Sequence, residues 1–317
     1  MNARFGDAAL ASALDRRISL PVIVAPMFLV SSVDLVVEAC RSGIVGSMPT
    51  FNARTPAILD EWLGQIGDSL REEVSAPHAM NIIAHSSNTR FDEDLDVIVK
   101  HRVPLVISSV GNPARVIDKV NAYGGHVLAD VASIKHARRA AEAGVNGLVL
   151  LCAGAGGHTG WLNPFAFVEE VRSFFDGPIA LAGGLSNGRQ VGALKALRVD
   201  YAFMGTRFLA AEENHANRTY RQMVIDSGAD DIVLTSEVSG MPANMLRLSL
   251  ERSDLDGKRP PSGKFEMTPN NDSQRAWRDV WGAGHGVGGV REVEPIREIV
   301  TRLKTEFAGA LGVSNGE

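Results

Sequence analysis

Pro178-Ile-Ala-Leu-Ala182 is a short apolar run that ends in Gly183-Gly184 and is followed by a helical pattern. The next run, Tyr201-Ala-Phe-Met204, again ends in a glycine, Gly205. A short apolar run followed by a helix is typical of a βα unit, whose parallel strand is covered on both faces. Residues 178–208 therefore predict two consecutive βα units, each of which closes its strand with glycine.

Six similar units precede these two along the chain. Their apolar runs are separated by helical patterns and cover residues 21–27, 43–48, 78–84, 104–110, 126–131 and 147–151. Eight such units match a (β/α)8 barrel, whereas a doubly wound sheet usually contains about five or six strands. The sequence therefore predicts the α/β class and, within it, a TIM barrel.

The alternation breaks after the eighth strand. Residues 212–272 contain a helical pattern, the strand-like run Ile232-Val-Leu-Thr235 and a polar stretch at 254–271 that is rich in Gly, Pro, Lys and Ser. We therefore expect a barrel domain made of residues 1–211 and 273–317, with the segment between them inserted as a lid or small second domain. Such a segment can cover the carboxyl ends of the strands, where barrels carry their active sites.

A last amphipathic helix is expected at residues 293–308. Its apolar face consists of Val293, Ile296, Ile299, Val300 and Leu303. Such a face is buried either against the chain's own core or against another molecule. The sequence therefore leaves two arrangements open, packing on the barrel or packing on a second subunit of a homo-oligomer.

The composition excludes several classes of protein. The chain has 317 residues, of which 45% are hydrophobic and 22% charged, so it is too apolar for a disordered protein. No apolar run reaches the roughly 18 residues of a membrane span, and a net charge of -5 without basic blocks argues against nucleic-acid binding. Residues 1–17 lack the pattern of a secretory signal, and Cys40 and Cys152 cannot form a disulfide framework. We expect a soluble, cytoplasmic protein.

The glycines after the seventh and eighth strands predict an anion site. Ala182-Gly183-Gly184 and Met204-Gly205-Thr206 end neighbouring strands, and glycine lets backbone N–H groups approach a ligand closely. Barrels of this kind often bind phosphate between these two loops. A pair of glycines after one strand is also an ordinary tight turn, but two such loops in neighbouring units favour a phosphate-bearing ligand.

His158 is the best single catalytic candidate. It follows Gly157 in the glycine-rich segment 152–160, after the sixth strand, where it is poorly placed for packing and well placed to meet a ligand. A histidine titrates near neutral pH and therefore suits proton transfer or a hydrogen bond to a developing anion. The alternative is a solvated loop histidine. His-Glu-x-x-His and Cys-x-x-Cys spacings are absent, so no metal centre is expected.

Two further features at strand ends are each open to two interpretations. Asn81 lies among apolar neighbours in the third strand, and a buried amide there needs a hydrogen-bond partner. The edge of a heterocyclic cofactor could provide that partner, and so could the barrel backbone. Ala25-Pro26-Met27, at the end of the first strand, could pack against a flat ring or belong to the core.

Together these stretches resemble the nitronate monooxygenase family, formerly called 2-nitropropane dioxygenases, whose members are flavoproteins with a barrel fold. The matching stretches occur in the family's order, from about residue 20 to about residue 290. The last of them is similar to the family's closing Trp-x-Ala-Gly-Gln-Gly signature. The stretches are Ala25–Met27, Gly156–Gly160, Ala182–Gly184 with Gly188, Met204–Phe208 and Trp281–Gly288.

The resemblance implies that the barrel binds FMN. The FMN phosphate would rest on the backbones of Gly183-Gly184 and Gly205-Thr206. The isoalloxazine ring would lie at the barrel mouth near Ala25–Met27, with Asn81 at its polar edge. The implied cofactor contacts are completed by Gly157, Ala182 and Met204.

The reaction that the resemblance implies is the oxidation of an alkyl nitronate, or of a nitroalkane, by O2 to a carbonyl compound and nitrite. The partners would then be a small-molecule substrate and O2. His158 would lie on the substrate side, where it would hydrogen-bond the nitro oxygens or, as a neutral base, deprotonate a nitroalkane. The flavin would perform the redox step.

The chain departs from the family's pattern at two positions. Many members carry a lysine after the fifth strand that helps to hold the flavin, whereas Asp130 is near that position here. The glutamine of the closing signature is replaced by His285. A carboxylate in place of an ammonium group removes a positive charge that would stabilise a reduced, anionic flavin. We count Asp130 among the expected cofactor contacts.

Two other functions fit the same residues. The loop around His158 and residues 127–133 also resemble FMN-dependent enoyl-acyl-carrier-protein reductases, so an NAD(P)H-dependent enoyl or quinone reductase is the alternative. The absence of a Gly-x-Gly-x-x-Gly fingerprint counts little against it, because flavin barrels bind nicotinamides without a Rossmann unit. A non-catalytic flavin-binding sensor is the third reading, and His158 in its glycine loop argues against it.

Overall fold

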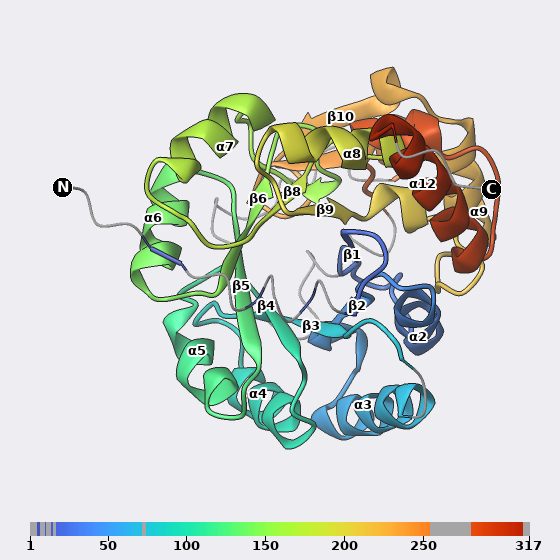
Figure 1. Cartoon of the computed structure of the whole chain (residues 1–317). Coiled ribbons are helices and arrows are strands. Elements are labelled where there is room, and N and C mark those ends of the chain that lie inside the picture. Colours follow the sequence, from blue (N-terminus) through green and yellow to red (C-terminus); the bar gives the residue numbers. More distant parts are fainter. Residues whose placement is uncertain are drawn as a thin grey trace.

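Eight parallel strands form one sheet that closes into a barrel (Figure 1). The computed structural model describes residues 5, 6, 10, 14, 17–71, 74–253 and 280–312. The strands follow one another in the order β1-β9-β8-β6-β5-β4-β3-β2. Their bounds are β1 Val22–Val24, β2 Ser47–Pro49, β3 Ala79–Ile83, β4 Leu105–Ser109, β5 His126–Val131, β6 Gly147–Leu151, β8 Ile179–Ala182 and β9 Tyr201–Met204. The sheet closes between β1 and the residues just before β2. Ile23 pairs there with Val45, and the Val45 N–H donates to the Val22 carbonyl at 3.0 Å.

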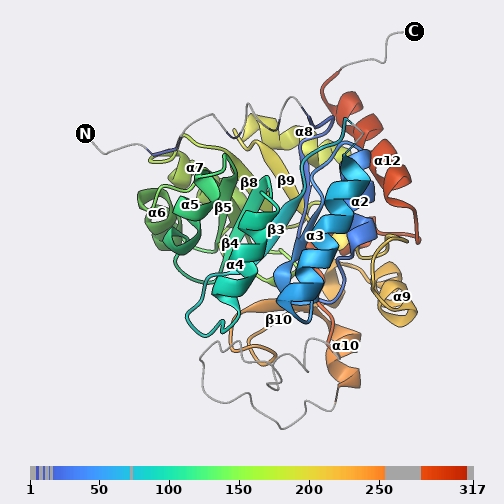
Figure 2. The same ribbon diagram turned by 90° about the horizontal axis from the view of Figure 1, so that it is seen from below.

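Helices surround the barrel and cover the outer faces of its strands (Figures 1 and 2). Several begin where a side-chain oxygen accepts a backbone N–H of the first turn, as Ser32, Thr55 and Ser133 do. The helices are α2 Val33–Arg41, α3 Pro56–Leu70, α4 Phe91–Lys100, α5 Ala114–Asn121, α6 Ile134–Glu142, α7 Pro164–Arg172, α8 Gly188–Ala196 and α12 Ile296–Ala310. The predicted (β/α)8 barrel is confirmed.

The barrel interior follows from the alternation of side chains along each strand. One buried cluster fills it with inward residues such as Leu105, Leu128 and Tyr201, and Leu10 and Leu14 join the same cluster. A second, larger cluster packs the outward residues of the strands against the helices. Between them, the two clusters fix the strands whose carboxyl ends carry the glycine loops.

The predicted last helix begins at Ile296 rather than at residue 293, because Pro295 is extended, with a ψ of 145°, and a proline disfavours the helical conformation of the residue before it. Its apolar face packs on the chain itself, since Ile296, Ile299, Val300 and Leu303 are fully buried. Val293 lies before the helix and is 41% exposed. Of the two arrangements open from the sequence, the structure shows packing on the barrel.

A small second sheet stands beside the barrel mouth. After β9 the chain forms a short 3-10 helix at Thr206–Phe208, and then α9, β10, β11 and α10, whose bounds are Arg218–Asp226, Ile232–Thr235, Ala243–Leu246 and Arg247–Arg252. β10 pairs antiparallel with β11, and β11 pairs antiparallel with β7 (Gly157–His158), which belongs to the loop after β6. β10 matches the predicted strand, whereas β7 and β11 were not predicted. The two-residue strand β7 is defined only by its pairing with β11.

The predicted polar stretch 254–271 lies outside the described residues. Within the described residues, no helix combines the length and the apolar character that crossing a membrane requires.

Candidate active site

A cavity of about 1370 Å³ opens at the carboxyl ends of the barrel strands. Its walls come from residues that follow β1, β3, β4, β5, β6, β8 and β9, together with the second sheet. Every candidate site residue from the sequence lines it; these are Ala25, Pro26, Met27, Asn81, Asp130, Gly157, His158, Ala182, Gly183, Gly184, Met204, Gly205 and Thr206. The structure therefore brings together residues that lie up to 181 positions apart in the chain, Ala25 to Thr206.

The loops after β8 and β9 border this cavity and contain four backbone N–H groups without an acceptor among the described residues. Gly183 and Gly184 have φ angles of +134° and +71°, which side chains other than glycine rarely adopt. Among the described residues, no hydrogen bond within the chain uses the N–H groups of Gly183, Gly184, Gly205 or Thr206. A Cβ atom on Gly184 would meet nothing within 4 Å, so this position borders open space. Four unpaired donors around an open space fit a phosphate group.

The conformation of the first loop is held from the start of α8. Gln190 donates from Nε2 to the Gly184 carbonyl at 3.0 Å and accepts the Ser186 and Asn187 N–H groups at 2.7 and 3.1 Å. Asn187 in turn caps α8 by accepting the Gln190 N–H at 3.0 Å. The carbonyl of Gly184 is thereby turned toward α8, which leaves its N–H directed elsewhere.

The closing signature packs backbone to backbone against the loop after β6. A Cβ atom on Gly284 would lie 2.4 Å from the Gly154 carbonyl oxygen, so only glycine fits there. The Gly284 N–H donates to Thr206 Oγ1 at 2.9 Å, which connects this signature to the anion loop after β9. His285 is exposed and does not line the cavity. The substitution of the family's glutamine by His285 therefore leaves the cavity wall unchanged.

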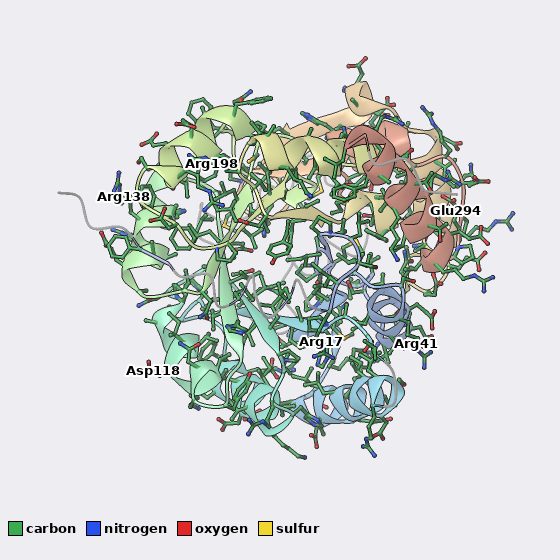
Figure 3. The ribbon with its side chains drawn as sticks, in the orientation of Figure 1. Arg17, Arg41, Asp118, Arg138, Arg198 and Glu294 are labelled. Carbon is green, nitrogen blue, oxygen red and sulfur yellow. The ribbon has the colours of Figure 1, made fainter. Side chains whose placement is uncertain are left out.

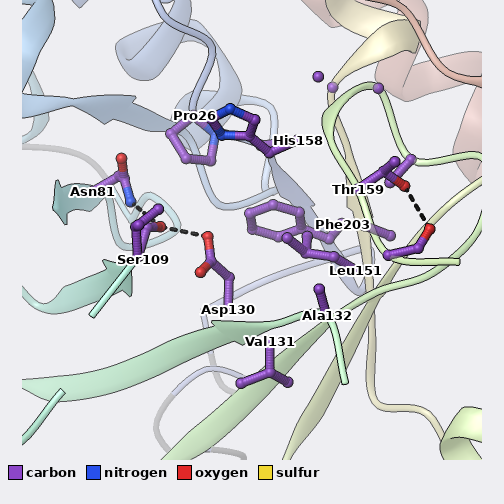
Figure 4. Close-up of a pocket in the computed structure, with 18 of the residues that line it drawn as sticks. Pro26, Asn81, Ser109, Asp130, Val131, Ala132, Leu151, His158, Thr159 and Phe203 are labelled. Carbon is purple, nitrogen blue, oxygen red and sulfur yellow. Dashed lines mark hydrogen bonds between the residues drawn. The ribbon is translucent and has the colours of Figure 1, made fainter. Parts of the chain in front are cut away.

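Three polar side chains from neighbouring strands form a chain of hydrogen bonds at the barrel mouth (Figure 4). Asn81 Nδ2 donates to the Ile107 carbonyl at 3.0 Å and to Ser109 Oγ at 2.6 Å, and the Ser109 hydroxyl donates to Asp130 Oδ2. Below them the same strands present apolar residues to the barrel interior. The row is therefore the uppermost inward layer of β3, β4 and β5.

Burial raises the pKa of Asp130 to about 6, although hydrogen bonds from Ser109 and from the Val110 N–H act in the opposite direction. Val110 itself has a φ of +46°, an uncommon conformation for a β-branched residue. Ser109 was not predicted as a site residue. Its signal in the sequence is weak: it occupies an inward position at the polar end of the run Leu105-Val-Ile-Ser-Ser109.

His158 reaches the cavity from β7, which is held by pairing with β11. Its Nε2 lies 2.9 Å from Ser239 Oγ, so the hydroxyl fixes the plane of the ring. Burial lowers the pKa of His158 to about 4, and the imidazole is therefore neutral at physiological pH. Ser239 was not predicted, and no sequence pattern marks it, because its contact with His158 bridges 81 positions.

The rest of the cavity is largely apolar and extends beyond the barrel mouth. Its aromatic lining residues are Phe28, Phe51, Trp161, Phe203, Tyr220 and Trp281. On one side the cavity continues along α5 and α6, where Ala114 and Ala140 line it. Among the described lining residues, Arg139 is the only lysine or arginine, and it shares the exposed rim with His136 and Glu142.

The described residues contain no group of three or more His, Cys, Asp or Glu side chains that could hold a metal ion. Cys40 and Cys152 are buried free thiols, and burial raises the pKa of each to about 12. Neither thiol is therefore a reactive thiolate at neutral pH. His78 is half-buried and does not line the cavity, and desolvation lowers its pKa to about 4.

Comparisons with known proteins agree with this architecture. The family model described as nitronate monooxygenase matches residues 51–259. A nitronate monooxygenase of Paraburkholderia phytofirmans is 24% identical over 92% of this chain and 93% of that protein. The (3aS,4S,5R,7aS)-5-hydroxy-7a-methyl-1-oxo-octahydro-1H-indene-4-carboxyl-CoA dehydrogenase of Mycobacterium tuberculosis is 25% identical over 82% of this chain and 73% of that protein.

Among other curated relatives, the matched stretch spans only between half and about two thirds of the relative's length. The solved structure of FabK from Thermotoga maritima superposes with a TM-score of 0.80 at 24% identity and covers 96% of both chains. That likeness concerns the fold. The family match assigns the chain to the flavin oxidoreductases, enzymes with small-molecule substrates. More specifically, the chain belongs to the nitronate monooxygenase family.

Proposed function

We propose that this enzyme uses FMN and O2 to oxidise alkyl nitronates to carbonyl compounds and nitrite. The observation that carries the proposal is one cavity lined both by the unpaired N–H groups after β8 and β9 and by His158. Four backbone donors fit the terminal phosphate of FMN, and they need no charged side chain to do so. The membership of the nitronate monooxygenase family supports the same reaction.

Bound FMN would supply the electron acceptor of the reaction. The chain's own residues would bind the cofactor and orient the substrate beside it. Gly183, Gly184, Gly205 and Thr206 would hold the phosphate, and Ala25–Met27 would border the ring. His158, held by Ser239, would place a neutral imidazole beside the nitro group, where a ring N–H can hydrogen-bond an oxygen that carries negative charge.

The low pKa of His158 favours a nitronate over a nitroalkane as the substrate. A base with a pKa of about 4 gains little by removing a proton from a neutral nitroalkane. A nitronate has already lost that proton, and a neutral imidazole can bind it without being charged. We therefore propose that nitroalkane oxidation is the slower activity of this site.

We also propose that residues 212–272 act as the lid of the site. Three contacts support this role: the pairing of β11 with β7, the bond between Ser239 and His158, and the presence of Leu234 in the cavity lining. Because the two cysteines are free, buried thiols, a reducing compartment suits the protein, and we propose the cytoplasm.

One observation favours a second candidate, a flavin-dependent reductase or dehydrogenase of a larger substrate. Pockets for a single drug-sized ligand measure roughly 300–1,000 Å³, and about 1370 Å³ leaves more room beside a flavin than a small nitronate fills. The M. tuberculosis relative is named as a dehydrogenase of a CoA thioester. An enoyl or quinone substrate, or NAD(P)H, would use the additional space.

The two candidates are separated by mixing the purified holoenzyme anaerobically with ethylnitronate and, in parallel, with NADH and NADPH. The nitronate is expected to bleach the flavin absorbance, and the aerobic reaction is expected to release nitrite in proportion to the nitronate consumed. Rapid bleaching by a nicotinamide, with none by nitronate, would overturn the first candidate in favour of the second.

A further inference from the structure

The orientation of the Asn81 amide is fixed by the chemistry of its neighbours. The Ile107 carbonyl only accepts hydrogen bonds, so the side-chain atom 3.0 Å from it must be the NH2 group. Ser109 has one hydroxyl hydrogen, which it donates in a hydrogen bond to the Asp130 carboxylate. Ser109 must therefore accept from Asn81 at 2.6 Å. Both N–H bonds of the amide are thereby used within the chain.

What Asn81 can offer the cavity is consequently its carbonyl oxygen. Asn81 lines the cavity and is 7% exposed. In Figure 4 its oxygen points away from Ser109, whereas its nitrogen points toward the hydroxyl. A ligand group that meets this oxygen must donate a hydrogen bond, because two acceptors facing each other in a buried site would both lack a partner.

Asp130 holds this arrangement at its other end. The carboxylate accepts hydrogen bonds from the Ser109 hydroxyl and from the N–H of Val110, whose φ is +46°. Val149 of β6 lies beside Asp130 in the sheet, and no charged side chain of the described residues contributes to the pKa of Asp130. The carboxylate is therefore a fixed acceptor without a neighbouring cation.

We propose that Asp130 and Ser109 are positioning residues that lock the Asn81 amide as a hydrogen-bond acceptor for the imide N–H of the flavin ring. This inference rests on the proposed flavin site. It gives Asp130 a different function from the lysine that many relatives carry near this position. A lysine would donate to the ring and add positive charge, whereas Asp130 acts through Ser109 and adds negative charge.

The proposal is tested by comparing the binding of FMN with that of N3-methyl-FMN, whose ring cannot donate at this position. The dissociation constants are measured by fluorescence titration of apo-protein. For the wild type, the N3-methyl derivative is expected to bind at least ten-fold more weakly, because the amide oxygen loses its donor. Asn81→Ala removes that oxygen and is expected to bind both flavins alike.

Ser109→Ala is the variant that tests the relay. Without the hydroxyl the amide loses one of its two anchors, and the preference for FMN is expected to fall several-fold toward that of Asn81→Ala. Ser108→Ala is the matched control, because Ser108 is a buried neighbour on β4 that lines the cavity outside the hydrogen-bonded row. It is expected to keep the wild-type ratio.

Asp130→Asn provides a second measurement, the flavin midpoint potential, which would not change if Asp130 had only a structural role. Removing a negative charge beside the ring is expected to shift the flavin midpoint potential to a more positive value, while Ser108→Ala leaves it unchanged. A wild type that binds both flavins equally, or a Ser109→Ala protein that keeps the full preference, would overturn the proposal while the flavin site stands. Failure of the wild type to bind FMN at all would overturn the proposed function as well.

Discussion

The two ends of the cavity are built from different parts of the chain. At the phosphate end, between the loops after β8 and β9, the groups offered to a ligand are backbone N–H groups, and glycine places them there. At the ring end, the polar groups belong to side chains of successive strands, and Asn81, Ser109 and Asp130 form one hydrogen-bonded row. The first end provides anchoring that many ligands with a phosphate could use. We propose that the second end selects the ring that is bound and tunes its redox potential.

The two ends of the cavity should also respond differently to substitution, because one offers backbone groups and the other side chains. A backbone donor is lost only when the conformation changes, so the phosphate end is sensitive to shape. A side-chain donor or acceptor is removed by a single isosteric substitution, so the ring and substrate end is sensitive to chemistry.

His158→Gln is expected to have the largest effect. Loss of a positioned imidazole typically lowers the catalytic rate by about 10²–10⁴-fold, and kcat/KM for a nitronate should fall within that range while FMN content stays constant. Because the pKa of His158 is about 4, this group should introduce no change in rate between pH 6 and pH 8. Steady-state nitrite assays across that range measure both quantities.

His285→Gln is the matched control, since His285 is exposed and lies outside the cavity. It should retain wild-type turnover. If His158→Gln and His285→Gln turned over nitronate equally well, the substrate side of the cavity would have been misassigned.

Gly184→Val tests the phosphate end. A β-branched residue at a φ of +71° must change the loop conformation, and the displaced N–H groups would cost one or two charge-assisted hydrogen bonds. The dissociation constant for FMN is expected to rise by about 100-fold, measured by fluorescence titration. Gly124→Val shares a positive φ of +83° and open surroundings but does not line the cavity, so it should keep its affinity.

Asp130→Asn should stabilise the apo-protein at neutral pH. The pKa of Asp130 is about 6 in the folded chain against an ordinary 3.8, so the folded state binds the proton more tightly than the unfolded state. The cost of the buried charge is therefore absent below about pH 4 and fully present above about pH 6. At pH 7.5 the variant should gain up to about 3 kcal/mol in the free energy of unfolding.

Urea unfolding at pH 4 and at pH 7.5 checks this prediction. The two proteins should converge at the lower pH, where both side chains are neutral. Equal stability at pH 7.5 would mean that Asp130 is not a desolvated carboxylate without a neighbouring cation.

Asn187→Ala should have the smallest effect. Removing the N-cap of α8 typically costs about 1 kcal/mol, and because Asn187 and Gln190 also fix the anion loop, FMN affinity should fall by a few-fold. Asn163→Ala removes the equivalent cap of α7 away from the cavity. Thermal unfolding should show similar losses for both variants, and only Asn187→Ala should weaken FMN binding.

The fold and the position of the glycine loops after β8 and β9 could be predicted from the sequence because both depend on local signals. Each apolar run was followed by a helix, and Gly183, Gly184 and Gly205 marked the strand ends where a ligand approaches the backbone. Buried parallel strands require apolar runs, and close approach of a ligand to the backbone requires glycine. Both signals can be recognised without knowledge of tertiary contacts.

The ring end could be predicted only in part. Asn81 is recognisable as an amide in an apolar strand, and Asp130 only as the residue near the family's lysine position. Ser109 connects them through the register of three strands, which no local pattern contains. The contact of Ser239 with His158 likewise depends on β7 pairing with a strand about 85 positions later. Tertiary contacts between small polar residues have no periodicity for a sequence to show.

The most direct test of the central claim is to release the cofactor of the purified protein by heat and to identify and quantify it by chromatography. We expect FMN at close to one molecule per chain, with the bound flavin lost from Gly184→Val and retained by Gly124→Val. Recovery of FAD or riboflavin in place of FMN, or a protein that neither carries nor takes up any flavin, would contradict the assignment of the cavity.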